Sequence, residues 1–243
     1  MNGLEHIVHT VSTMALPLLF AMVLHEYAHG WVAAQCGDPT AKLQGRLTLN
    51  PLAHIDPFGT IILPLICLIL PGSFLLGWAK PVPVDPRCMR QPRRDMALVA
   101  AAGPGMNLLL AVVSALALAV IELTAPQNSQ QAGAAQPQSL ATFLLVPLAY
   151  MAFYSVLINV FLALFNLIPI PPLDGGRILT CLLPAKPALA LARLEPYGML
   201  ILVGLIVFDK ELGVIHAVTG TLASGLSGTI LSTAIGLATG ATE

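Results

Sequence analysis

The stretch VLHEYAHG at residues 23–30 lies in an apolar part of the chain and predicts both a helix and a metal site. His25 and His29 are four residues apart, so on an α-helix both imidazoles would lie on one face and reach a single ion. H-E-x-x-H on a helix is typical of zinc hydrolases, where the histidines bind the ion and the glutamate is a general base. We therefore predict His25 and His29 as metal ligands and Glu26 as the catalytic residue.

The composition is that of a membrane protein. Of the 243 residues, 56% are hydrophobic and only 9% are charged, whereas a soluble domain carries about 25% charged residues. No basic cluster contains interleaved aromatic residues, so no nucleic-acid partner is expected, and the four cysteines lack metal-type or disulfide-type spacing. We predict a single membrane-embedded domain over residues 1–243, with a core at 4–208 and a weakly hydrophobic C-terminal helix at 209–243.

The apolar segments predict an all-α polytopic membrane protein with about four to six transmembrane helices. Apolar segments of this kind run over residues 4–34, 96–123, 140–167, 196–208 and, more weakly, 212–241. Residues 58–76 are interrupted by prolines, so this segment crosses once or forms a re-entrant hairpin. Short membrane-associated β-strands are expected at 47–49 and at 78–84, where two prolines suit an edge strand.

The basic residues predict the orientation of the chain. By the positive-inside rule, the arginine-rich loop at 87–94 and the segment at 177–193 should be cytoplasmic, and the uncharged loop at 126–138 external. Lys42 and Arg46 place the C-terminal end of the first helix, and with it the histidine pair, toward the cytoplasm. This arrangement requires residues 58–76 to be re-entrant.

A catalytic zinc ion needs a third protein ligand and one open position for water. Asp174 is the best candidate, because it follows a proline-rich break after an apolar span, where irregular backbone must be buried or line a wet cavity. A carboxylate at that depth also needs a strong partner, which a metal ion supplies. His54 and Asp56 are competing candidates: they are ligands, residues with a gating or secondary metal role, or polar residues of a membrane-surface turn.

Three stretches, HEYAH at 25–29, GPGMN at 103–107 and NLIPIPPLDG at 166–175, resemble in order the signature motifs of the site-2 protease family of intramembrane zinc metalloproteases. The stretches LTLNPLAHIDP at 47–57 and GWAKPVPV at 77–84 further resemble its compact bacterial subgroup, which lacks PDZ and CBS domains. The resemblance covers residues 16–177. It implies one Zn²⁺ per chain held by His25, His29 and Asp174, with Glu26 as the base.

The resemblance also implies a multi-pass protein of the bacterial cytoplasmic membrane, whose site near the cytoplasmic face cuts the transmembrane segment of a membrane protein. Asn107 and Asn166 are candidates for oxyanion or substrate contacts; interhelical hydrogen bonding and a loop brace are the alternatives. The segment at 78–84 could hold an unwound substrate by strand addition. Besides substrate and lipid bilayer, a regulatory membrane partner is an open expectation, and the oligomeric state is not predicted.

Two other functions remain open from the sequence. A membrane metal-binding protein or transporter could use the same cluster to handle zinc, although it would have no need of Glu26 beside a ligand. A catalytically inactive scaffold is the second alternative, and the complete ligand set argues against it.

Overall fold

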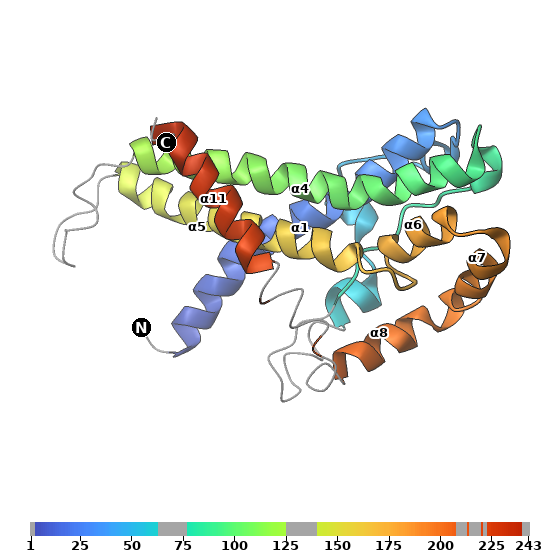
Figure 1. Cartoon of the computed structure of the whole chain (residues 1–243). Helices are drawn as coiled ribbons and strands as arrows, with labels where there is room; N and C mark the ends of the chain where they lie inside the picture. The colour runs from blue at the N-terminus through green and yellow to red at the C-terminus, as the bar shows by residue number, and fades with distance from the viewer. Residues whose placement is uncertain are drawn as a thin grey trace. The chain divides into compact units, whose positions relative to one another are not determined.

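The computed structural model describes residues 3–62, 77–124, 140–207, 213, 220 and 223–239, and all regular structure within these ranges is helical (Figure 1). This confirms the predicted helical class. The α-helices are α1 (Gly3–Gln35), α2 (Thr40–Leu43), α4 (Pro92–Thr124), α5 (Leu140–Asn166), α6 (Asp174–Leu182), α7 (Ala185–Ala192), α8 (Gly198–Val207) and α11 (Ser224–Thr239). Shorter 3-10 or π turns are η1 (Pro51–His54), η2 (Pro57–Ile62), η3 (Pro86–Cys88) and η5 (Glu195–Tyr197).

Two of the described helices are long and apolar enough to cross a membrane. These are α4 and the part of α5 at Leu144–Asn166.

The helix α1 is followed by a glycine in the left-handed conformation, Gly37, whose φ is 106°. The N–H groups of Gly37 and Asp38 donate to the carbonyls of Ala34 and Ala33, which satisfies the last carbonyls of the helix.

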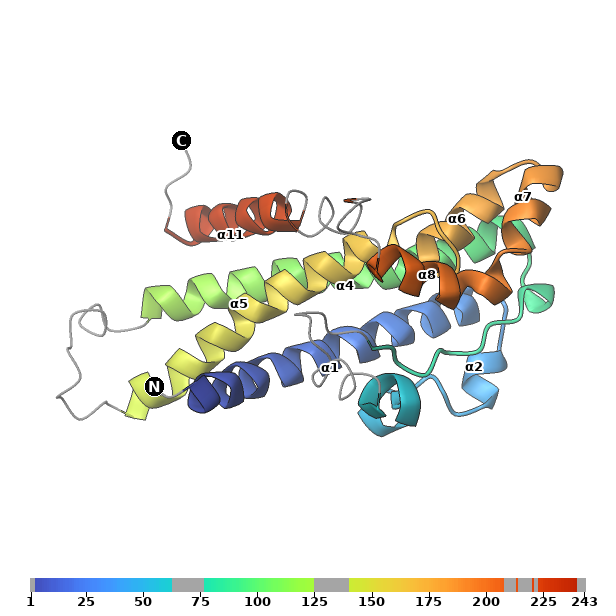
Figure 2. The ribbon, with the colours of Figure 1, turned by 90° about the horizontal axis from the view of Figure 1, so that it is seen from below.

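The chain divides into two compact units, and α1, α4 and α5 each contribute to both. The first unit comprises Met1–Ala21, Asn107–Leu164 and Asp209–Glu243. Its core contains alanines at every fourth position of α4, which pack with residues of α5 and α11; Figure 2 shows the course of these three helices. Small residues at these positions let helices approach closely, which is how helices associate in lipid. The core members are Ala111, Ala115, Ala119, Val156, Val160, Ala223 and Ala234.

The second unit comprises Met22–Met106 and Phe165–Phe208 and contains the histidine pair. The carboxylate of Asp38, which is fully buried, ties two of its segments together. It accepts hydrogen bonds from the N–H and the hydroxyl of Thr40 and from the N–H of Asp85. Since three donors converge on it, the turn after α1 is fixed to the segment that precedes η3.

The structure corrects the prediction of short strands. Residues 47–49 and 78–84 are both described, and neither forms a strand. In the second segment Pro81 and Pro83 remove two N–H donors, and the N–H groups of Lys80 and Val82 bond to His54 and Glu26 instead of to a neighbouring strand. Residues 63–76 and 125–139 lie outside the described residues, so the re-entrant hairpin and the external loop stay predictions.

Candidate metal centre

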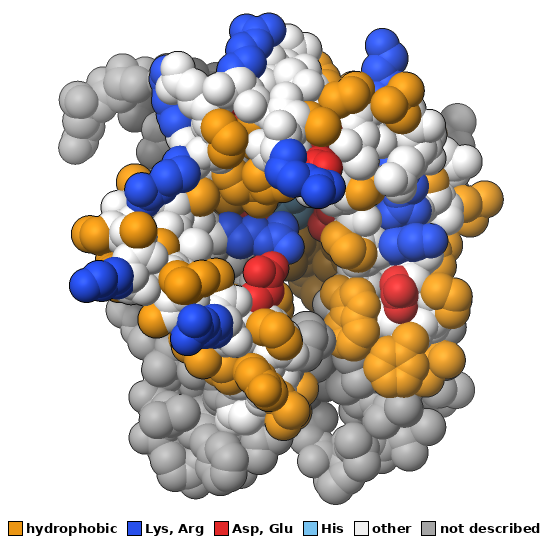
Figure 3. Space-filling view, turned by 90° about the vertical axis from the view of Figure 1, so that its right-hand side faces the viewer, with side chains coloured by type: hydrophobic (Ala, Val, Ile, Leu, Met, Phe, Trp, Pro, Cys, Tyr) orange, Lys and Arg blue, Asp and Glu red, His pale blue; other side chains and the backbone are white. Residues whose placement is uncertain are grey.

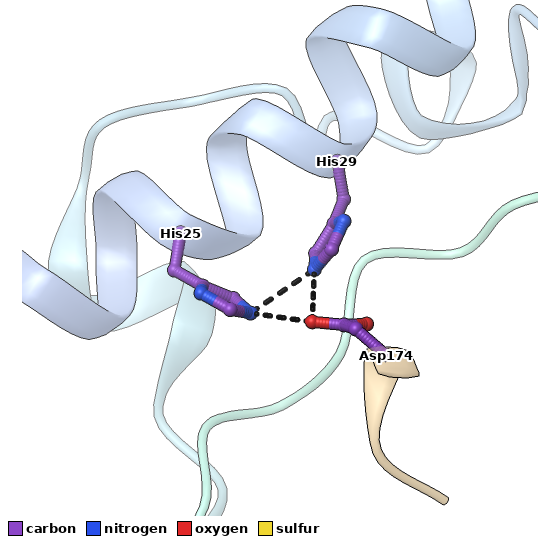
Figure 4. A group of neighbouring side chains, drawn as sticks. All are labelled: His25, His29 and Asp174. Carbon is purple, nitrogen blue, oxygen red and sulfur yellow. Dashed lines mark hydrogen bonds and ion pairs between the residues drawn. The ribbon is translucent and has the colours of Figure 1, made fainter. Parts of the chain in front are cut away.

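Three ligand atoms of the second unit meet at one point (Figure 4). Nε2 of His25 and Nε2 of His29 are 3.1 Å apart, and Oδ2 of Asp174 lies 3.1 Å from the first and 3.3 Å from the second. The histidines extend from consecutive turns of α1, and Asp174 is the first residue of α6. All three side chains are buried.

The distances in this cluster match those of a zinc site. Zinc bonds of about 2.0–2.2 Å in a tetrahedron separate the ligand atoms by about 3.3–3.6 Å. The observed separations of 3.1–3.3 Å are close to that range. Within the described part of the chain, His25, His29 and Asp174 are the only group of three or more His, Cys, Asp or Glu side chains near enough to share an ion. The residues therefore fit zinc.

The hydrogen bonds around the cluster leave its inner atoms available to a cation. Nδ1 of His29 lies 2.7 Å from the carbonyl oxygen of Val99 on α4, and a carbonyl can only accept. The ring proton of His29 is therefore on Nδ1, and the lone pair of Nε2 faces the cluster. Oδ2 of Asp174 is buried and receives no hydrogen bond from the described residues. Acceptors that converge in this way are compensated by a metal ion.

Gly103 of α4 lies directly against the two imidazoles. A Cβ added to Gly103 would be 2.4 Å from Nε2 of His29 and 2.5 Å from Nε2 of His25. A side chain at Gly103 would therefore require the imidazoles or one of the two helices to move. The glycine thus keeps space beside the ligand nitrogens.

A tight turn places Asp174 in the cluster. The N–H of Leu173 donates to the carbonyl of Ile170, and the N–H of Gly176 donates to the carbonyl of Leu173. A Cβ on Gly175 would lie 2.2 Å from the carbonyl oxygen of Leu167, so the turn packs against the first residues of α6 without room for a side chain. The proline-rich break predicted from the sequence therefore positions the carboxylate of Asp174.

Glu26 follows His25 on α1 and is not one of the converging ligands. Its side chain is half-buried. Its Oε2 accepts a hydrogen bond of 2.8 Å from the backbone N–H of Val82, which comes from the segment after residue 77. A carboxylate beside the ligands but outside their set is what a general base requires.

Asn107 belongs to the first unit and takes part in a buried amide network. Its Nδ2 donates to Oδ1 of Asn159 at 2.8 Å and to the carbonyl of Ala21 at 3.4 Å. Asn159 in turn donates to the carbonyl of Ser155. Sequence inspection missed Asn159, although an amide inside the apolar α5 is the signal that could have revealed it. An oxyanion role for Asn107 stays a prediction.

Asn166 is the last residue of α5 and is half-buried in the second unit, and its predicted role is likewise untested.

His54 and Asp56 make the hydrogen bonds of a turn. Nε2 of the buried His54 donates to the carbonyl of Thr48 at 2.9 Å. Oδ1 of Asp56 accepts from the N–H groups of Phe58 and Gly59, which caps η2. Both residues lie outside the metal cluster. A gating or secondary metal role for either one stays a prediction.

Cationic side chains surround a hollow on the face shown in Figure 3. In the second unit, Arg93 donates to the carbonyls of Cys181 and Leu183 and so caps the C-terminal end of α6. Arg87 pairs with Asp85, and its guanidinium hydrogen bond lowers the pKa of that half-buried carboxyl to about 2. The loop predicted to be cytoplasmic is therefore basic and partly fixed to the rest of its unit.

Comparison with known proteins agrees with this geometry. The family model of peptidase family M50 matches residues 13–208. YwhC of Bacillus subtilis (strain 168) is 40% identical over 202 residues, which cover 82% of this chain and 81% of the relative. Rip2 of Mycolicibacterium smegmatis is 32% identical over 189 residues, 78% of this chain and 64% of the relative. The name of each relative assigns it provisionally to the zinc metalloproteases.

Rip2 of Mycobacterium tuberculosis (strain H37Rv) is 32% identical over 184 residues, 76% of this chain, and the chain spans just under two thirds of both Rip2 proteins. No solved structure matches this chain. The chain belongs to peptidase family M50, the site-2 protease family. It is a zinc metalloprotease, and the family together with the two apolar helices makes it a membrane protein.

Proposed function

We propose that the protein is an intramembrane zinc endopeptidase that hydrolyses peptide bonds within or near the transmembrane segments of membrane proteins, as in regulated intramembrane proteolysis. The observation that supports this proposal is the buried His25, His29 and Asp174 cluster at zinc-like spacing, with Glu26 beside it. Two of the three ligands lie on α1, and the residues that flank the histidine pair in this helix are almost all apolar. A soluble peptide would reach such a site less readily than a segment already in the bilayer.

Each residue of the site has a distinct role in the proposed reaction. His25, His29 and Asp174 would hold zinc. When bound, zinc would supply the Lewis acid that makes a water molecule nucleophilic near neutral pH. Glu26 takes the proton of the attacking water and passes it to the amine that leaves.

The substrate must lose its helical structure before it is cut. The peptide bonds of a transmembrane helix are engaged in hydrogen bonds between residues four apart, so the carbonyl to be attacked has to be released first. We propose that the cut lies near the cytoplasmic end of the segment, because the basic loop and the C-terminal end of α1 occur in the same unit.

A contact between the flanks of residues 63–76 supports the proposed re-entrant topology. The N–H of Trp78 donates to the carbonyl of Gly59 at 3.1 Å, and the hydroxyl of Thr60 donates to the carbonyl of Trp78 at 2.8 Å. A chain that leaves and returns at one place has both flanks on the same side of the membrane. A single crossing would put them on opposite sides.

The test is a comparison of purified wild-type protein with Glu26→Gln on a panel of single-span membrane proteins. We expect cleavage by the wild type and none by the variant, with equal zinc content, because Glu26 is not a ligand in the cluster. Equal cleavage by both would end the endopeptidase proposal. Zinc transport that survives Glu26→Gln, without cleavage by either protein, would favour the transporter instead.

A further inference from the structure

We propose that the backbone N–H of Val82 positions the carboxylate of Glu26, and that Arg46 is the positioning residue that holds this N–H in place. The inference rests on the proposed function, because it concerns the general base of that reaction. We call residues 78–85 the strap. Its contact with Glu26 is the 2.8 Å hydrogen bond from Val82 to Oε2.

The sequence of the strap leaves one donor at this point. Pro81 and Pro83 have no N–H, so Val82 carries the only backbone donor between Lys80 and Val84. That donor is directed at Glu26. The side chain of Val82 is buried, and its Cγ1 would lie 2.9 Å from a Cβ added to Gly30, one helical turn beyond Glu26. The valine therefore packs against the same face of α1 that carries the base.

Arg46 fixes the strap from the other side. Its Nη2 donates to the carbonyls of Lys80 at 2.9 Å and Pro81 at 3.2 Å, and its Nη1 donates to the carbonyl of Ala53. The N–H of Lys80 donates to the carbonyl of His54 at 2.8 Å. One planar guanidinium thus joins η1 to the two peptide groups that precede Val82. The position of the Val82 N–H is set by these bonds.

This arrangement suits positioning better than inhibition of the base. A carboxylate has two oxygens, and an N–H bound to Oε2 fixes the plane of the group while the hydrogen bond occupies only one of them. A glutamate on a helix otherwise samples several rotamers, so a rigid donor narrows the range of places from which it can take a proton. Several bonds hold the strap in this place, which is expected of a scaffold.

The same bonds bear on the predicted capture of substrate by strand addition. The N–H of Lys80, the N–H of Val82 and the carbonyls of Lys80 and Pro81 are already engaged within the chain. A substrate strand would have to displace them. Because the strap already binds Glu26, we assign it the role of positioning the base and not that of binding substrate.

The hydrogen bond itself is tested by NMR on the zinc-loaded protein. The dipeptide Pro-Val occurs only at 81–82 and 83–84, so ¹³C-carbonyl proline with ¹⁵N-valine gives two amide signals, those of Val82 and Val84. We expect Glu26→Ala to move the Val82 amide proton upfield and to move Val84 much less, because a donor to a carboxylate is strongly deshielded. Equal small shifts of both signals would overturn the inference.

The functional role is tested by steady-state kinetics on Arg46→Gln, with Arg87→Gln as the matched control. Arg87 is exposed and pairs only with Asp85 in the described structure. Like Arg46→Gln, the substitution Arg87→Gln removes one positive charge from the second unit. We expect Arg46→Gln to lower kcat by up to about 10²-fold with KM and zinc content unchanged, because a displaced base reduces the chemical step alone. Arg87→Gln should match the wild type.

The outcomes separate this inference from the proposed function. An unchanged kcat, a higher kcat, a rise in KM alone or a loss of zinc in Arg46→Gln would each overturn the positioning role. The proposed function would still stand if Glu26→Gln were inactive. If Glu26→Gln kept full activity, the proposed function would fail, whatever Arg46→Gln did.

Discussion

Gly103 of α4 and His29 of α1 approach each other so closely that a methyl group on the glycine would come within 2.4 Å of the imidazole Nε2. The two residues are far apart in the sequence and lie in two of the three stretches that resemble the family motifs. Their contact shows that the GPGMN stretch contributes space to the metal centre. Gly103 itself has no side chain that could bind a metal ion.

The first prediction concerns this space. Gly103→Ala should lower zinc occupancy and proteolysis together, because the added Cβ would push Nε2 of His29 and of His25 away from their positions. Zinc per chain, measured by mass spectrometry after gel filtration, checks it. Gly105→Ala is the control on the same helix, since a Cβ there meets nothing within 4 Å and zinc should be retained. Full zinc occupancy in Gly103→Ala would contradict the prediction.

The second prediction separates the carboxylate ligand from its sequence competitor. Asp174→Asn should lose most of its zinc, because a neutral amide is a much weaker zinc ligand than a carboxylate. Asp56→Asn should keep its zinc, since Asp56 caps η2 and lies outside the cluster. The measurement is zinc per chain during dialysis against a chelator. The reverse pattern would move the ligand assignment to Asp56.

The third prediction concerns the amide network of the first unit. Asn107→Ala and Asn159→Ala each remove the 2.8 Å hydrogen bond between them and should lower the free energy of unfolding by about 1–3 kcal/mol. Their coupling in a double-mutant cycle should be about 0.6–1.7 kcal/mol, as for other hydrogen bonds between membrane helices. Denaturation in mixed micelles gives both quantities. Strictly additive losses would show that the bond does not form.

The same two variants also test the predicted substrate role of Asn107. If Asn107 contacts substrate, Asn107→Ala should lose far more kcat than Asn159→Ala at equal stability. Equal losses of kcat would assign Asn107 to packing alone.

The fourth prediction concerns topology. The bonds from Trp78 and Thr60 hold the flanks of residues 63–76 together, so residues on either side should face one compartment. In a background without the four native cysteines, single cysteines at the exposed positions Leu52 and Arg87 should react with an impermeant maleimide from the same side. Labelling from opposite sides would show that the segment crosses.

Local patterns predicted the part of the site that depends on helix geometry. The four-residue spacing of His25 and His29 determines where both imidazoles point once α1 forms, and the apolar run ensures that it forms. Asp174 was predicted as the third ligand from chemistry, because few ionisable residues occur at that depth and a zinc ion needs a third ligand. The bounds of α1, α4 and α5 differ from the sequence-based ranges by only a few residues.

Contacts between backbone and distant side chains could not be predicted in this way. Alternating apolar residues at 78–84 suggested a strand, but a strand needs a partner, and the donors of this segment instead reach Glu26 and His54. No periodicity in the sequence indicates that Arg46 binds the carbonyls of Lys80 and Pro81, which follow it by 34 and 35 positions. Such contacts arise from tertiary packing, which decides between a strand and an irregular segment when local preferences are weak.

The close approach of Gly30 and Val82 adds residues to the sequence pattern that defines this kind of site. Any side chain at position 30 would collide with Val82, whose Cγ1 lies 2.9 Å from a Cβ placed there. The Val82 side chain would then have to move, next to the N–H that binds Glu26. A search for related proteases should therefore look for six residues, H-E-x-x-H-G, paired with a distant P-x-P, and should discount chains in which one half occurs without the other.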